Sequence, residues 1–151
     1  MEYKITLRDE SETIELAQNI ESEKFYNMVI CLNGDLGSGK TVFAKGFASA
    51  LGIDEVITSP TFNIVKEYTS GEIPLFHMDV YRLDETDVEI DFAEYFVKKG
   101  VTIIEWSDMI KDVLPEERLE INFKIIGENT RLVIIKPIGK RYEDLCEAVL
   151  W

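Results

Sequence analysis

The residues that decide the fold stand at positions 34–41 and read Gly34-Asp35-Leu36-Gly37-Ser38-Gly39-Lys40-Thr41. They match the pattern G-x-x-x-x-G-K-T of a phosphate-binding loop, or P-loop, which joins a strand to a helix. Residues 28–32 before it form a short apolar run typical of a buried strand. Residues 41–51 after it carry apolar side chains at helical spacing and are followed by Gly52. The stretch therefore predicts an α/β fold built around a strand, a loop and a helix.

Phosphate binding follows from the residue types in this P-loop. Backbone N–H groups in such a turn form an anion-binding concavity, and the start of the helix adds unpaired amides and the positive end of a dipole. We expect Lys40 to reach the β- and γ-phosphates and the Thr41 hydroxyl to bind Mg²⁺. A glycine-rich turn without a ligand is the alternative. The loop residues predicted to bind a nucleotide are Gly34, Gly37, Ser38, Gly39, Lys40 and Thr41.

The rest of the chain alternates between strand and helix patterns. The other expected strands are 3–7, 62–68, 73–80, 101–104, 119–125 and 131–136, and the other expected helices are 9–20, 84–99, 108–114 and 142–150. Turns at 69–72 and 127–130 predict two antiparallel hairpins, whereas the strand before the P-loop and the strand before Glu105 are expected to be parallel. We therefore expect a single domain over residues 1–151, with a mixed sheet, a parallel core and helices on both faces.

Two apolar runs end in acidic residues, Asp79 and Glu105. In open α/β sheets a ligand lies beyond the carboxyl ends of the strands, so both carboxylates are expected to face the phosphates. We assign Glu105 to Mg²⁺, and Asp79 to positioning the attacking water or supporting the ion; the opposite assignment stays open. Thr61 follows the P-loop helix in the sequence Ser-Pro-Thr-Phe, where it would bond the γ-phosphate or the ion's water shell. An ordinary loop is the alternative there.

Three residues near these acids carry less distinctive signals. His77, the only histidine, lies in an apolar strand, which favours a structural role over a catalytic one. No second histidine and no cysteine pair supports a metal-ligand cluster. Arg82 would act as an electrostatic helper in cis or form a salt bridge, and the salt bridge is the favoured interpretation. Trp106 would stack on a base or a partner, with packing at the strand end as the alternative.

Composition narrows the functional classes. The 151 residues include 16 Lys and Arg against 29 Asp and Glu, a formal net charge of −13, which argues against a general nucleic-acid binder. The charge suits a basic protein partner or simply keeps the chain in solution. Cys31 and Cys146 are expected in the core, which fits a reducing cytoplasm. The N-terminus lacks a signal-peptide pattern, and no apolar run approaches the ~20 residues that span a bilayer.

The order of these motifs resembles the bacterial TsaE (YjeE) family of small P-loop ATPases. The P-loop is followed by Ser-Pro-Thr-Phe at 59–62, His-Met-Asp-Val-Tyr-Arg-Leu at 77–83 and Ile-Glu-Trp at 104–106, and the resemblance spans about residues 1–137. Asp91 stands where the family often has glycine, so the resemblance does not predict the backbone conformation at this position. The resemblance implies the same roles for Lys40 and Thr41, a Mg²⁺-linked Glu105, a Walker B-like Asp79, and a switch-loop Thr61; Trp106 matches a characteristic family position.

The resemblance also implies a function. Family members are cytoplasmic ATPases that act with the TsaB–TsaD pair in forming threonylcarbamoyladenosine at tRNA position 37. We therefore expect slow, partner-stimulated ATP hydrolysis with ATP or ADP and Mg²⁺ bound, and little direct contact with nucleic acid. A small-molecule kinase would need an arginine-rich lid, and a small GTPase would need an N-K-x-D motif; the sequence has neither. A nucleotide-dependent binding module without turnover stays an alternative.

Overall fold

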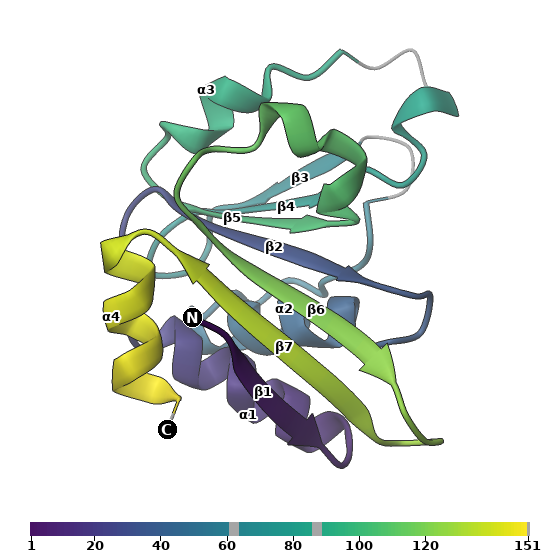
Figure 1. The fold of residues 1–151 in the computed structure, drawn as a ribbon. Helices are drawn as coiled ribbons and strands as arrows, with labels where there is room; N and C mark the ends of the chain where they lie inside the picture. Colours follow the sequence, from purple (N-terminus) through teal and green to yellow (C-terminus); the bar gives the residue numbers. More distant parts are fainter. Residues whose placement is uncertain (61–63, 86–88, 151) are drawn as a thin grey trace.

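The computed structural model describes residues 1–60, 64–85 and 89–150, and within them one sheet of seven strands runs in the order β1-β7-β6-β2-β5-β4-β3 (Figure 1). The strands are β1 (Tyr3–Leu7), β2 (Met28–Gly34), β3 (Val65–Tyr68), β4 (Leu75–Asp79), β5 (Val101–Glu105), β6 (Arg118–Ile125) and β7 (Arg131–Ile138). The helices are α1 (Glu10–Glu21), α2 (Lys40–Ala50), α3 (Phe92–Phe96) and α4 (Lys140–Val149), with 3₁₀ segments η1 (Leu83–Glu85) and η2 (Ser107–Val113).

The centre of the sheet is parallel and its flanks are antiparallel. Strand β2 pairs in parallel with both β5 and β6, and β4 pairs in parallel with β5. The hairpins β3–β4 and β6–β7 are antiparallel, and β1 adds antiparallel to β7. This confirms the predicted mixed sheet. Because β2, β4 and β5 run the same way, their carboxyl ends meet at one edge, where the P-loop begins.

Two apolar clusters cover the two faces of the sheet. Helices α1, α2 and α4 pack on one face, while α3 and η2 cover the other (Figure 1). On β4 and β5, Leu75 and Ile103 belong to the first cluster, whereas Met78 and Ile104 belong to the second. Side chains alternate along a strand, so Asp79 and Glu105 face the α2 side. The prediction of helices on both faces is confirmed, and the acids lie on the side that carries the P-loop helix.

The expected helix over residues 84–99 is wrong in its described part. The chain there forms the short η1 turn and then α3, which is little more than one turn long. Asp91 has non-helical angles of φ −87° and ψ 88°, and its side chain accepts a hydrogen bond from Glu94 N, so the helix begins after Asp91. The partly buried residues that hold this segment on the second face are Ile90, Phe92, Tyr95 and Phe96. Packing of this short apolar group, rather than helical periodicity over the whole segment, decides its structure.

Other local predictions hold. Asp9 caps α1 by accepting from Glu12 N at 3.0 Å, and Glu12 Oε1 accepts from Arg8 N at 2.8 Å, so the expected capping residues mark the start of the helix. Cys31 and Cys146 are both buried free thiols, and burial raises the pKa of Cys31 to about 12. No described helix has the length and apolar character needed to cross a bilayer.

Candidate functional site

The P-loop connects the end of β2 to the start of α2 and leaves its amides available. Gly34, Gly37 and Gly39 all have positive φ angles, of 149°, 80° and 117°. Gly39 is the N-cap of α2, and neither a capping side chain nor an acidic residue in the first turn occupies the helix start. The unpaired N–H groups of that turn can therefore bind an anion.

Ser38 provides a test of whether this loop fits a phosphate group. Its side chain is fully buried, and its Oγ has no hydrogen-bond partner among the described residues. A Cβ added at Gly34 would lie 2.6 Å from that Oγ and 2.6 Å from the Phe123 carbonyl oxygen. An unpartnered hydroxyl in a loop that only glycine can form fits an anion cradle.

Lys40 lies at the base of the cradle with its charge free of direct ion pairs. Its Nζ donates to the carbonyl oxygens of Gly34 and Asp35 and lies 3.9 Å from the centroid of the Trp106 ring. Burial lowers the pKa of Lys40, and the nearby carboxylates of Glu105, Asp79 and Asp35 oppose that shift. Because the ion pairs of the described residues do not include Lys40, its ammonium group is available to a phosphate.

Thr41 and Glu105 join the P-loop helix to the central strand β5. Thr41 Oγ1 lies 3.0 Å and 3.2 Å from the two carboxylate oxygens of Glu105, to which it donates. Glu105 is only 2% exposed, and its Oε2 also lies 2.6 Å from His77 Nε2. The hydroxyl oxygen keeps its lone pairs when it donates to Glu105, so it remains able to bind a cation.

Asp79 lies beside Glu105 at the end of β4, since the two residues are register partners. Its Oδ2 accepts from Ser59 Oγ at 2.7 Å, and its Oδ1 accepts from Tyr81 N at 3.1 Å. Both oxygens are thereby held in place, although the residue is only partly buried. The structure thus brings together Lys40, Thr41, Asp79 and Glu105, and their individual roles stay predictions.

Trp106 turns the chain away from the sheet directly after Glu105. Its φ of 62° is in the left-handed region, and its N–H donates to Leu32 O at 2.8 Å. Its ring lies 4.6 Å from the Tyr81 ring, and the side chain packs against the cluster on the second face. The packing alternative is therefore correct for part of this side chain, and its predicted contact with a nucleotide stays a prediction.

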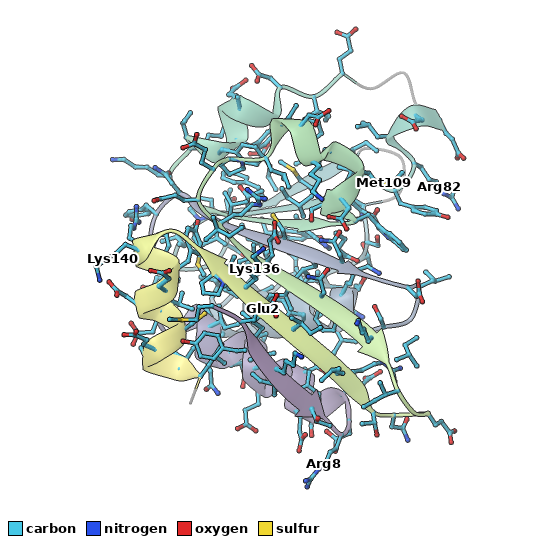
Figure 2. The ribbon with its side chains drawn as sticks, in the orientation of Figure 1. Glu2, Arg8, Arg82, Met109, Lys136 and Lys140 are labelled. Atoms are coloured by element: carbon cyan, nitrogen blue, oxygen red, sulfur yellow. The ribbon has the colours of Figure 1, made fainter. Side chains whose placement is uncertain are left out.

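Three other sequence interpretations have different outcomes. Thr61 lies outside the described residues. Arg82 is exposed at the periphery of the molecule (Figure 2) and forms no ion pair with any described residue, so the favoured salt bridge is absent from this part of the chain. His77, which was interpreted as structural, contacts the candidate Mg²⁺ ligand directly.

A cavity of about 320 Å³ opens above the P-loop. Its walls are the loop itself, the ends of β4 and β5, the N-terminus of α1 and the turn between β6 and β7. Lining residues outside the predicted site are Asp9, Glu10, Thr13, Leu36, Val42, Ser59, Asn129 and Arg131. A second cavity of about 320 Å³, lined in part by Leu36, Pro60, Tyr81 and Arg82, adjoins it through shared residues.

Arg131 is a site residue that the sequence interpretation missed. Its Nη2 donates to Gly37 O at 3.1 Å, and its Nη1 donates to the carbonyl oxygens of Gly127, Glu128 and Thr130. The guanidinium group thereby ties the β6–β7 turn to the P-loop. The only signal in the sequence was an arginine after a predicted turn, which is common on protein surfaces.

Asn33 also organises the site without a sequence signal. Its Nδ2 donates to Ser107 Oγ at 2.8 Å, and its Oδ1 accepts from Asp108 N at 3.0 Å. The end of β2 therefore holds the corner that follows Glu105 and Trp106.

Comparisons with known proteins identify relatives of this chain. The chain matches the family model of the threonylcarbamoyl adenosine biosynthesis protein TsaE over residues 7–133. It is 49% identical over 119 residues to the tRNA threonylcarbamoyladenosine biosynthesis protein TsaE of Bacillus subtilis. The aligned residues cover 79% of this chain and 75% of that protein. It is 35% identical over 147 residues to the protein of the same name from Nostoc sp., with 94% of this chain and 90% of that one covered.

A solved structure shows the same fold. The crystal structure of Bacillus subtilis YdiB matches with a TM-score of 0.84 and 40% identity, over 99% of this chain and 94% of that chain. The family resemblance inferred from the motifs is confirmed by the family model, by the curated relatives and by this structure. The chain belongs to the TsaE family.

Proposed function

We propose that this chain is a Mg²⁺-dependent ATPase that acts in the threonylcarbamoyladenosine modification of tRNA position 37. The observation that carries the chemical part is the contact between Thr41, at the start of the P-loop helix, and Glu105, at the end of the neighbouring strand. Family membership and the names of the relatives support the biological part.

ATP or ADP would be held by the P-loop. Its amides and Ser38 fit the phosphates, and Lys40 supplies the positive charge. Trp106 would line the nucleotide site beside Lys40.

Thr41 and Glu105 would bind Mg²⁺ together with the phosphates, and Asp79 would support it. No group of three or more His, Cys, Asp and Glu side chains that could hold a metal ion occurs among the described residues, which suits an ion that also binds phosphate oxygens. When bound, Mg²⁺ neutralises the charge that develops on the phosphates.

Asp79 is the candidate for orienting the attacking water. Its carboxylate is fixed by Ser59 and the Tyr81 amide and lines the cavity next to Lys40. A fixed acceptor at that place can hold a water molecule in one orientation, which is the main task left to protein groups in phosphoryl transfer. Thr61 is proposed to contact the γ-phosphate from the adjoining loop.

The partner is proposed to be the TsaB–TsaD pair in the cytoplasm, with residues 1–151 acting as one ATPase domain. A net charge of −13 disfavours direct binding to tRNA and favours docking on a protein. We expect hydrolysis to be slow in the isolated chain and faster with the partner, as the family resemblance implies.

The test compares nucleotide binding and phosphate release. ATP, ADP and GTP titrations with Mg²⁺ should show a preference for adenine nucleotides, and Lys40→Ala should abolish binding. Lys45→Ala is the matched control, because Lys45 lies on the same helix and is exposed. Phosphate release is then measured with and without TsaB–TsaD.

Two results would contradict the proposal. Equal affinities for GTP and ATP would refute the adenine preference. Binding without phosphate release, in the presence and absence of TsaB–TsaD, would refute the ATPase assignment and favour a nucleotide-dependent binding module.

A further inference from the structure

His77 is a buried polar residue that the proposed hydrolysis does not yet use. It lies in the middle of β4, between Phe76 and Met78, and its side chain has no solvent exposure. Its register partner on β5 is Ile103, two residues before Glu105. The histidine therefore reaches along the sheet toward the end of β5, where its Nε2 lies 2.6 Å from Glu105 Oε2.

The other ring nitrogen shows which atom carries the proton. His77 Nδ1 is buried and has no hydrogen-bond partner among the described residues. A carboxylate oxygen accepts hydrogen bonds, so a neutral ring bonded to Glu105 Oε2 carries its proton on Nε2 and leaves Nδ1 with a bare lone pair. The ring is therefore protonated at Nε2, and it donates to Glu105 rather than accepting from it.

Donation by His77 restricts how the Glu105 carboxylate can be oriented. Oε2 receives the histidine bond on the side of β4, while Thr41 Oγ1 approaches both oxygens from α2. A carboxylate that is 2% exposed and bonded from two directions cannot rotate without breaking one of these bonds. The contacts form one path, from His77 through Glu105 to the hydroxyl at the start of the P-loop helix.

We propose that His77 is a positioning residue for the magnesium site, holding Glu105 so that Thr41 and the carboxylate together present oxygen ligands to the ion. This inference rests on the proposed function, because it assigns a purpose to Glu105 within that site. Groups that hydrogen-bond to metal ligands set their orientation, and removing such a group lowers metal affinity by about 10- to 100-fold. His77 touches neither nucleotide nor ion and acts through Glu105.

Two substitutions separate donation from packing. His77→Gln retains an N–H donor near the position of the histidine Nε2, whereas His77→Leu fills similar space without a donor. Thr102→Val is the matched control, since Thr102 is a buried polar residue on β5 whose side chain lies on the opposite face from Glu105. Far-UV circular dichroism establishes that each variant is folded.

The measurement is ADP affinity by calorimetry, in EDTA and across a Mg²⁺ titration. We expect His77→Leu to need about 10- to 100-fold more Mg²⁺ for the same gain in ADP affinity, with binding in EDTA unchanged. His77→Gln should recover most of the wild-type Mg²⁺ dependence, and Thr102→Val should match the wild type. Unchanged Mg²⁺ dependence in His77→Leu, or equal losses in the Leu and Gln variants, would overturn the positioning role.

A second measurement needs no variant and no nucleotide. Because the chain has one histidine, ¹⁵N chemical shifts of its imidazole report this ring alone. A proton on Nε2 supports the assignment, and a ring protonated on Nδ1 alone overturns it even if His77→Leu fails to fold. Wild-type protein that binds no nucleotide would instead overturn the proposed function, so the two failures are distinguishable.

Discussion

Replacing Gly34 with alanine should damage the P-loop far more than the same change at Gly37. Both glycines have positive φ angles, but their surroundings differ. A Cβ at Gly34 would lie 2.6 Å from the backbone oxygen of Phe123, whereas a Cβ at Gly37 would meet nothing within 4 Å. Each variant therefore carries a backbone cost, and only Gly34→Ala adds an overlap with the Phe123 carbonyl.

The size of the difference follows from these two costs. An unfavourable φ costs about 1–3 kcal/mol, and overpacking costs another ~1–3 kcal/mol, so Gly34→Ala should lose about 2–6 kcal/mol. Gly37→Ala should lose only the left-handed cost of about 1–2 kcal/mol. The overlap is hard to relieve because Phe123 is paired with Gly34 on one side and with Val133 on the other, so its carbonyl is held inside the sheet.

Urea unfolding and ADP calorimetry measure the two consequences. We expect a lower free energy of unfolding in Gly34→Ala than in Gly37→Ala, together with a larger loss of ADP affinity, because the overlap also displaces Ser38. Equal losses in the two variants would refute the reasoning, since they would show that the Phe123 carbonyl imposes no constraint on the loop.

Three further outcomes can be measured with single substitutions. Tyr142→Phe should lower the free energy of unfolding in urea by about 1–3 kcal/mol, because the buried Val29 N–H loses the Tyr142 hydroxyl that accepts its hydrogen bond at 2.8 Å. The control is Tyr26→Phe, which should change the stability little because Tyr26 is 54% exposed. Burial raises the pKa of Tyr142 from 10.0 to about 12, so the folded state holds this proton more tightly than the unfolded state. The contribution of the Tyr142 proton to the free energy of unfolding is therefore present below pH 10 and is lost as the pH rises through 12. The reasoning would be contradicted if the stability of the wild type and of Tyr142→Phe fell identically with rising pH. Arg131→Gln should raise the dissociation constant for ADP by about 2- to 10-fold, because it removes the bond to Gly37 O; unchanged calorimetric affinity would show that this tie is dispensable.

Much of the fold and part of the candidate site were predictable from local pattern. The apolar runs before Asp79 and Glu105 predicted strands, and shared strand direction places both acids at the P-loop edge. The helix over 84–99 was mispredicted because Asp91 caps a short helix that starts there, and spacing alone does not show which apolar residues find a surface to cover.

The sequence by itself determined the P-loop and the strand and helix around it, and it supplied the residues that we propose to bind magnesium and phosphate. The P-loop pattern depends on spacing within one short segment, which sets the face of each side chain. Only the tertiary structure decided that His77 meets Glu105 and that Arg131 reaches Gly37, 94 residues earlier in the chain. Such contacts depend on which strands become neighbours. That order results from burying both apolar faces of the whole sheet, which no single segment encodes.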